Sequence, residues 1–460
     1  MACSPTSLGR SSPLAAGHAS RLPWLRAWRV AALAFAFGLV GAQLAEIPWR
    51  HALRGYDNTF NFLWLRSLAV DGDWMFANDI SQCPTLSEDY QRSALSLVSD
   101  VPDRVPNKYG VGWAVLTTPG YVLAELLVAA GNGLGLWDLE RDGWNAVYQV
   151  CIVLWHAALG LVALGLAHAV VRRWVDEPWV STGVITVWLG SSLPYYQMSN
   201  VGMSHGAVFF SVAAAAFALV RGLEAPHARW TWLAAGAALG LAVVSRHQSA
   251  VYCLFALAAV AARGRALGWR AAGAAVWLAA GAAPFLGLQM VAWRVVYGRW
   301  FVFTYGVEGE GFSWLRPAWP EALFSPFHGL FYWHPLLFLA TAGLTWWAWE
   351  RRGAAVVGVA TTVATLYINA AWWCWWFAAS FGSRSFDAAL LPLMAGQAFL
   401  FERLPEAARR ILWVACGLLG AWNAYVLLLY RTATISRNEP VTWVEMLAAA
   451  TRLAEHLRLE

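Results

Sequence analysis

The sequence predicts an all-α integral membrane protein, a polytopic bundle of about 11–13 transmembrane helices with a large first exterior loop. Of its 460 residues, 59% are hydrophobic and only 13% are charged, which is about half the charged fraction of a typical soluble domain. Many stretches of roughly 17 to 25 residues carry no charge, enough at about 1.5 Å per residue to cross a hydrocarbon layer about 30 Å thick. A soluble protein of this length could not bury so many apolar helices, so most of the chain is expected to lie in lipid.

The chain divides into three parts. Residues 1–29 form a tail with basic residues before the apolar run 30–44, which is typical of an uncleaved first span that starts in the cytoplasm. Residues 30–430 form the transmembrane module, and within it 48–109 is a hydrophilic insertion that faces the exterior and carries juxtamembrane helices. Residues 431–460 are expected to form an exterior amphipathic tail, which either lies on the membrane or packs on the bundle.

Arginine placement predicts the orientation of the later spans. Arginines fall in every second loop, and such loops are cytoplasmic; they include Arg172, Arg173, Arg221, Arg229, Arg351, Arg403, Arg409 and Arg410. The intervening loops then face the opposite side. The net charge of +5 is distributed in this way along the chain, so it indicates orientation and not a nucleic-acid partner.

One segment does not fit this alternation. Residues 110–130 are long enough to span, but the following loop, with Asp138, Glu140 and Asp142, is acidic and reads as exterior. We therefore interpret 110–130 as re-entrant or interfacial, which Gly112, Pro119 and Gly120 would permit.

Soluble nucleotide chemistry and structural zinc are not indicated. The six cysteines contain no CxxC pair, so neither a disulfide framework nor a zinc site is expected. No P-loop, nucleophile elbow, zinc-protease helix or dinucleotide-binding glycine pattern stands in a suitable context. The polar clusters gather instead in the segments expected to face the exterior.

Asp57 opens the exterior insertion directly after the first span. A carboxylate at headgroup depth could accept a proton from an acceptor while facing a lipid phosphate. The same residue could instead cap a helix over 59–69, and spacing alone does not separate the two roles.

Further polar residues follow in the insertion. Asp71 and Asp73 have the spacing of a carboxylate pair that could share a divalent metal or sugar hydroxyls, although a solvated Asp-Gly turn explains the pattern more simply, and we do not favour a metal. Lys108 is the only lysine among 32 basic residues. A compact ammonium kept where every other basic residue is arginine suggests a phosphate contact, with chance as the alternative.

Charged residues also stand at the exterior ends of later spans. Arg246 and Arg384 lie where a charge in the bilayer costs about 2.5–3.5 kcal/mol, so pairing or ligand contact is expected. Simpler explanations are snorkelling for Arg246 and a pair between Arg384 and Asp387 one helical turn apart. His328, beside Gly329, could reach a phosphate or sugar.

These motifs resemble those of the GT-C superfamily of polyprenyl-phosphate-sugar-dependent glycosyltransferases, in the branch of dolichyl-phosphate-mannose protein mannosyltransferases and bacterial aminoarabinose transferases. The resemblance is carried by the first span with its large outward loop and by short segments that follow it, namely Gly55-Tyr56-Asp57, Asp71-Gly72-Asp73, Pro106-Asn107-Lys108-Tyr109, residues 325–329 and residues 380–384.

The resemblance implies an inverting membrane glycosyltransferase of the bacterial inner membrane whose active site faces the periplasm. Its donor would be a polyprenyl-phosphate sugar, its acceptor a lipid, glycan or protein, with no nucleic-acid partner. Asp57 would be the catalytic acidic residue, and Lys108, Arg246 and Arg384 would bind the donor phosphate. Candidates for sugar or acceptor contacts are Asp71, Asp73, Asp79, Asn107, Tyr109 and His328.

The sequence departs from the family in having no second acidic residue adjacent to Asp57. A polytopic lipid or solute transporter or flippase is the alternative function, since transporters also place ionisable residues in broken spans. The absence of an internal repeat and the single large loop after the first span favour the glycosyltransferase.

Overall fold

The computed structural model describes residues 23–97, 99–225, 228–267, 272–307, 309–351 and 353–459. Most of the predicted cytoplasmic tail lies outside these residues. Within them the chain is helical, and the one β-bridge that is recorded joins Phe312 to Trp372. The helices are α2 (Pro23–Glu46), α3 (Tyr56–Arg66), η1 (Ser67–Asp71), α4 (Ala77–Ser81), α5 (Glu88–Leu95), α6 (Gly112–Gly133), α7 (Ala146–Val171), α8 (Trp179–Leu189), α9 (Leu193–Met198), α10 (His205–Glu224), α11 (Arg229–Ser245), η2 (His247–Tyr252), α12 (Cys253–Leu267), α13 (Ala272–Tyr297), α14 (Thr304–Val307), α15 (Trp319–Phe324), α16 (Leu330–Trp333), α17 (Leu336–Arg351), α18 (Ala354–Ala371), η4 (Arg384–Ala389), α19 (Leu390–Arg403), α20 (Glu406–Arg431) and α21 (Trp443–Leu459).

Seven of the described helices are long and apolar enough to cross a membrane, namely α2, α6, α7, α10, α13, α18 and α20. Shorter apolar helices, including α8, α11, α17 and α19, pack between them. The all-α polytopic prediction is therefore confirmed. The total of about 11–13 spans stays a prediction, because it depends on how many of the shorter helices cross.

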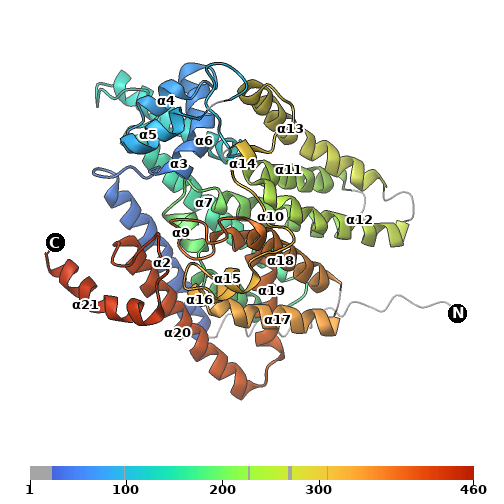
Figure 1. Cartoon of the computed structure of the whole chain (residues 1–460). Coiled ribbons are helices and arrows are strands. Elements are labelled where there is room, and N and C mark those ends of the chain that lie inside the picture. The colour runs from blue at the N-terminus through green and yellow to red at the C-terminus, as the bar shows by residue number, and fades with distance from the viewer. Residues whose placement is uncertain are drawn as a thin grey trace.

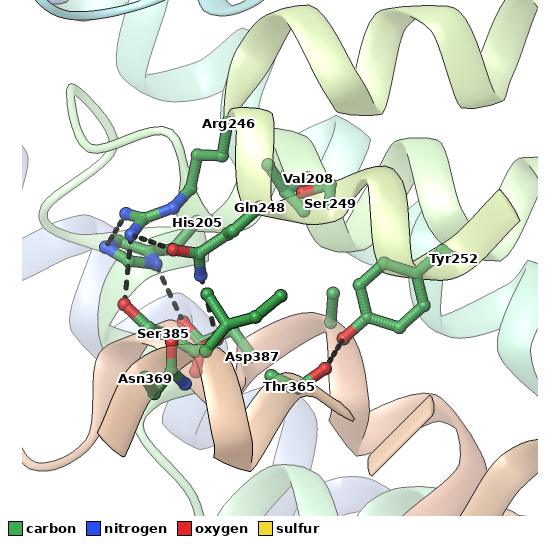
Figure 2. Close-up of a pocket in the computed structure, with 12 residues that line it drawn as sticks. His205, Val208, Arg246, Gln248, Ser249, Tyr252, Thr365, Asn369, Ser385 and Asp387 are labelled. Atoms are coloured by element: carbon green, nitrogen blue, oxygen red, sulfur yellow. Dashed lines mark hydrogen bonds and ion pairs between the residues drawn. The ribbon is translucent and has the colours of Figure 1, made fainter. Parts of the chain in front are cut away.

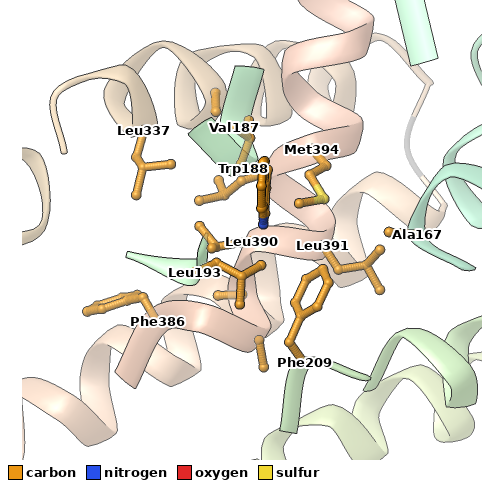
Figure 3. Close-up of a cluster of buried hydrophobic side chains, with 14 of the residues drawn as sticks. Ala167, Val187, Trp188, Leu193, Phe209, Leu337, Phe386, Leu390, Leu391 and Met394 are labelled. Atoms are coloured by element: carbon orange, nitrogen blue, oxygen red, sulfur yellow. The ribbon is translucent and has the colours of Figure 1, made fainter. Parts of the chain in front are cut away.

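The main core lies where α8, α10, α17 and α19 meet (Figure 3). Trp188 of α8 is 2% exposed and packs among apolar side chains that include Phe209 and Met394. Its indole N–H donates to Gln197 Oε1 at 2.8 Å, so the one polar atom of this buried ring is satisfied. The core fixes α8, α9 and α10 on one side of the bundle and η4 and α19 on the other.

Helices α11 and α13 touch backbone to backbone. A methyl group added at Gly236 would stand 2.0 Å from the carbonyl oxygen of Leu278, and one added at Gly281 would stand 2.0 Å from that of Leu233. Small residues allow such close approach between membrane helices. The contact places α13 beside the C-terminal end of α11, where Arg246 follows.

The predicted exterior insertion gathers at one end of the bundle, where α3, α4, α5 and α6 lie together (Figure 1). Helix α3 begins at Tyr56, and its N-cap is Gly55 with φ 87° and no side-chain cap. The alternative in which Asp57 caps a helix starting at Thr59 is therefore wrong. Because the helix starts earlier, Asp57 stands in its first turn, with its carboxylate free for tertiary contacts.

Segment 110–130 forms one continuous helix, α6, with Pro119 inside it, so a re-entrant turn within it is wrong. Trp155 of α7 donates to the carbonyl oxygen of Leu116 at 2.7 Å, and Tyr148 near the start of α7 bonds to Glu125. Helix α6 thus packs antiparallel along the first half of α7. The interfacial interpretation stays a prediction, because α6 is also long enough to span.

The C-terminal tail forms the helix α21, as predicted. Met446 and Ala449 are buried against the bundle, and Tyr425 of α20 donates to the carbonyl oxygen of Met446 at 2.7 Å. Trp443 stacks on Tyr332, with ring centroids 4.7 Å apart. Of the two expectations for the tail, packing on the bundle is the one that these contacts favour.

Candidate active site

Asp57 is bonded through both carboxylate oxygens to residues far away in the sequence. Tyr109 donates its hydroxyl proton to Oδ1, and Arg384 Nη2 lies 2.9 Å from Oδ2. The Asp57 side chain is 27% exposed, whereas that of Arg384 is 12% exposed. The tertiary structure therefore joins the start of the exterior insertion to the segment before α19, and the alternative pairing of Arg384 with Asp387 is wrong.

Arg384 is held in position by a tight loop. Gly382 has φ 61°, and an added methyl group would stand 2.1 Å from Nε2 of His334. His334 is buried and bonded through Nδ1 to Asn423 of α20, so it cannot easily give way. Only glycine suits this position, and the turn it makes sends Arg384 towards Asp57.

Lys108 lies on the other side of Tyr109. Its Nζ is 2.7 Å from Oε1 of Glu310, and it is within 6 Å of the ring centroids of Tyr56, Tyr109 and Tyr305. Thr304 donates to the backbone oxygen of Lys108 at 2.9 Å. The exterior segment after α13 is thus fastened to the end of the insertion.

Arg246 points inward, as Figure 2 shows, so snorkelling does not describe it. Nη1 lies 3.0 Å from Nε2 of His205, and Nη2 donates to Ser385 Oγ at 2.9 Å. Because a guanidinium only donates, His205 Nε2 is the acceptor and the imidazole proton is on Nδ1. That nitrogen faces Oδ2 of Asp387 at 3.9 Å, while Ser192 donates to Oδ1 of Asp387 at 2.5 Å.

The charges shift the pKa of the two carboxyl groups in opposite directions. Burial alone would raise the pKa of Asp57, but Arg384, the hydrogen bond from Tyr109, and the charges of Lys108 and Arg246 outweigh it, so this pKa is below its usual range. For Asp387 burial prevails over the hydrogen bond from Ser192 and over both arginines, and raises the pKa to about 8. Asp57 is therefore a carboxylate at neutral pH, whereas Asp387 is mostly the neutral acid.

An apolar cavity of about 590 Å³ leads to this cluster. Its polar end includes Arg246, Tyr305 and Trp372, and its walls come from α13 and from the segment after it, with Leu286, Met290, Trp293, Phe301 and Phe303. A separate small polar pocket under Arg246 is lined by His205, Asn369 and Asp387 (Figure 2). Arg246 and Asn369 line both spaces, so Arg246 stands where the apolar cavity and the polar pocket meet.

The remaining predicted contacts separate into two groups. Tyr109 belongs to the cluster, and Asn107 supports it from behind, since its side chain donates to the Phe60 carbonyl at 2.8 Å and accepts from the Tyr109 amide at 3.1 Å. His328 is 1% exposed and has φ 65°. Its Nδ1 donates to the Trp376 carbonyl at 2.8 Å, and its Nε2 has no partner. Burial lowers the pKa of His328 to about 4, so it is a neutral imidazole.

Asp71, Asp73 and Asp79 stand at the far end of α3, away from Asp57. Arg66 pairs with Asp71 at 2.9 Å and also with Asp79, which is 1% exposed. Asp73 accepts from the Met75 amide at 2.9 Å. The structure does not bring these carboxylates to the cation cluster. Among the described residues no group of three or more His, Cys, Asp or Glu could hold a metal ion.

The sequence alone did not point to three residues of the cluster as site residues, namely His205, Glu310 and Asp387. His205 reads as a polar helix end, Glu310 as one of several loop acids, and Asp387 as a local partner of Arg384. No spacing could reveal them, because His205 meets Arg246 across 41 positions and Lys108 meets Glu310 across 202.

The fold and this cluster define a multi-pass α-helical membrane protein with three cations around a partly buried carboxylate. The chain matches no protein-family model and no curated protein. Among solved structures it is similar to ArnT from Cupriavidus metallidurans bound to undecaprenyl phosphate, with 15% identity, 93% of this chain and 68% of that chain covered, and a TM-score of 0.53. The apo state of the same protein gives 0.52 with the same coverage.

A third similar structure is the archaeal oligosaccharyltransferase AglB from Archaeoglobus fulgidus, in complex with an inhibitory peptide and a dolichol-phosphate. The two chains are 11% identical, and the match covers 94% of this chain and 54% of that chain. The TM-score is 0.43, which is too low to indicate a shared fold. The likeness to ArnT extends along nearly the whole chain, and at this identity it shows the fold. The chain therefore shares the membrane fold of ArnT, which agrees with the fold that the resemblance predicted.

Proposed function

We propose that this protein is a membrane glycosyltransferase that moves a sugar from a polyprenyl-phosphate donor to an acceptor, with inversion. The observation that carries the proposal is the convergence of Asp57, Lys108, Arg246 and Arg384 in one cluster, in which Arg246 also lines the apolar cavity. The cavity suits a polyprenyl chain, and the cations suit its phosphate. The ArnT structure with the same fold is bound to undecaprenyl phosphate.

The donor's leaving group is a phosphate monoester, which needs positive charge more than a proton. Lys108, Arg246 and Arg384 would supply that charge. Asp57 is ionised, but while Arg384 holds it, its lowered pKa makes it a weak base. A donor phosphate that draws Arg384 towards itself would weaken this hold, and the pKa of Asp57 would then rise because burial favours its neutral form.

Asp57 would then accept the proton of the acceptor hydroxyl as that oxygen attacks the anomeric carbon. The bond from the anomeric carbon to the phosphate oxygen breaks on the opposite side, which inverts the configuration. The cluster includes residues of the segments predicted to face the exterior, and we propose that transfer takes place on that side of the bacterial inner membrane. The sugar and the class of acceptor, whether lipid, glycan or protein, are open.

The test is transfer of radiolabelled sugar from a panel of synthetic polyprenyl-phosphate sugars in proteoliposomes. Wild type should consume one donor, Asp57→Asn should lose about 10²–10⁴-fold in rate, and Lys108→Met should bind the donor more weakly. Asp89→Asn is the matched control, because Asp89 is an exposed acid of the same insertion whose recorded partner is Arg92.

Full transfer by a folded Asp57→Asn variant would overturn the role of Asp57. A purified protein that consumes no donor, but moves lipid or solute across the bilayer, would replace the proposal with the transporter function.

A further inference from the structure

Glu310, which forms an ion pair with Lys108, is the charged residue of the cluster that the proposed reaction does not use. Nζ of Lys108 lies 2.7 Å from Oε1 of Glu310, and the two side chains are 14% and 10% exposed. Trp372 donates its indole N–H to Oε2 at 3.0 Å. Both oxygens of one carboxylate are therefore bound, one by a cation and the other by a neutral donor, at the polar end of the apolar cavity that Trp372 lines.

A phosphate bound at this place would use the same donors. Phosphate oxygens take charge-assisted hydrogen bonds from ammonium groups and further bonds from N–H donors. The three tyrosine rings around the ammonium, Tyr56, Tyr109 and Tyr305, restrict the space in which an anion can approach it. Glu310 and a donor phosphate would therefore compete for Lys108.

We propose that Glu310 is an internal competitor that occupies the phosphate position on Lys108 and sets the affinity of the protein for its lipid phosphate. The inference rests on the proposed function. In the empty protein Glu310 holds a carboxylate against the Lys108 ammonium, whose side chain is 14% exposed, and so offsets part of the cost of burying that charge. When the lipid phosphate binds, the Glu310 carboxylate leaves and the phosphate takes its place.

The local backbone suits such an exchange. Glu310 stands between Gly309, which has φ 75°, and Gly311, and neither glycine has a neighbour within 4 Å of an added methyl group. The chain directly after it is fixed, since the Trp373 amide donates to the Gly311 carbonyl at 3.0 Å and the Ser313 amide to that of Ala371 at 2.6 Å. The exchange then needs only a rotation of the Glu310 side chain away from Lys108, with this anchored backbone in place.

Competition of this kind also favours product release. The sugar donor is a phosphodiester with one negative charge, whereas the lipid phosphate left after transfer is a monoester with a charge between −1.5 and −2, about that of a phosphorylated side chain at pH 7. The monoester would bind Lys108 more strongly than the donor does. A carboxylate that returns to Lys108 lowers the affinity for both, and so limits inhibition by the product.

The experiment measures binding of undecaprenyl phosphate, without sugar, to the purified full chain in nanodiscs. Glu310→Gln keeps an oxygen for the Trp372 indole but removes the charge, and it should bind about 10-fold more tightly than wild type, a change of about 1.4 kcal/mol. Glu321→Gln, an exposed acid of α15, is the matched control and should bind as wild type does.

A double substitution separates competition from other effects. The Lys108→Met variant lacks the ammonium for which Glu310 and the phosphate compete. Adding Glu310→Gln to that variant should therefore change its affinity for undecaprenyl phosphate by less than about 2-fold. Equal or weaker binding by Glu310→Gln, in a variant whose unfolding temperature matches wild type, would overturn the inference and leave the proposed function standing. Failure of wild type and all variants to bind any undecaprenyl phosphate would overturn both.

Discussion

Asp57 and Asp387 share Arg246 and Arg384 as electrostatic neighbours, yet their pKa values move in opposite directions. The difference lies in the direct partners of the two carboxyl groups. Asp57 is paired directly with Arg384 at 2.9 Å and accepts a bond from Tyr109, whereas Asp387 has one hydroxyl partner and an Oδ2 atom without a hydrogen bond. Direct pairing keeps a buried carboxylate charged, and distant charges do not.

The first prediction concerns Arg384. In Arg384→Gln the pKa of Asp57 should rise, because burial then acts against a weaker set of positive charges. The acidic limb of the pH profile of kcat/KM for sugar transfer should therefore move to higher pH, and the rate at neutral pH should fall. Arg384→Lys keeps the charge, so its limb should stay near that of wild type. An unmoved limb in Arg384→Gln would contradict the assigned pairing.

The second prediction concerns Asp387, whose pKa of about 8 is above the value of about 3.9 for an unfolded chain. Its contribution to stability is fully present below pH 4 and is lost as pH rises through about 8, at up to about 1.4 kcal/mol per pH unit. Asp387→Asn should remove this slope from the unfolding temperature measured against pH in detergent. The slope should persist in Asp89→Asn, and a slope retained in Asp387→Asn would show that another group causes it.

At the scale of elements, the contact of α11 with α13 sets the width of the apolar cavity, since α13 supplies Leu286, Met290 and Trp293 to its wall. Gly281 touches the backbone of α11, whereas Gly287, on the same helix, has no neighbour within 4 Å. The two glycines are therefore a matched pair with different surroundings.

The third prediction follows from that pair. Gly281→Ala should destabilise the protein by about 1–3 kcal/mol, because the added methyl group forces the helices apart, and it should weaken binding of undecaprenyl phosphate. Gly287→Ala should keep the stability of wild type or raise it slightly. Thermal unfolding in detergent measures the first effect and the nanodisc binding assay the second. Equal behaviour of the two variants would mean that the contact does not set the cavity.

At the scale of the whole molecule, the insertion helices and the helix ends that carry arginine lie in different parts of the bundle. The insertion helices α3 to α6 gather at one end, while α12 and α17, each with an arginine in its last turn, both end on the right of Figure 1, opposite α21. This arrangement agrees with the orientation that the arginine pattern predicts, with Asp57 on the exterior side.

The fourth prediction tests that orientation. In a chain whose native cysteines are replaced, Ser93→Cys in α5 should react with a membrane-impermeant maleimide on intact spheroplasts. Ala407→Cys, at the start of α20, should react only after permeabilisation. Both positions are exposed, so access differs only by the side of the membrane. The reverse pattern would place the candidate active site in the cytoplasm.

The sequence by itself determined the class of the protein, because apolar stretches long enough to cross a bilayer allow only helices. It also singled out four candidates, Arg246 and Arg384 because charges at span ends are costly, Asp57 because it directly follows the first span, and Lys108 because it is the only lysine. The alternative in which Asp57 caps the helix is wrong because the helix starts at Tyr56, three residues earlier than that alternative assumed. Its N-cap is Gly55, in a backbone conformation that the sequence pattern alone does not reveal.

Only the tertiary structure decided which charges meet. Arg384 could pair with Asp387 three residues away or with Asp57 at 327 positions distance, and the turn at Gly382 selects the second. Asp71, Asp73 and Asp79 have the residue types of a binding site, but the fold pairs two of them with Arg66. A local sequence pattern indicates where a charge is costly to place. The partner that offsets this cost is determined by the packing of segments that are distant in the chain.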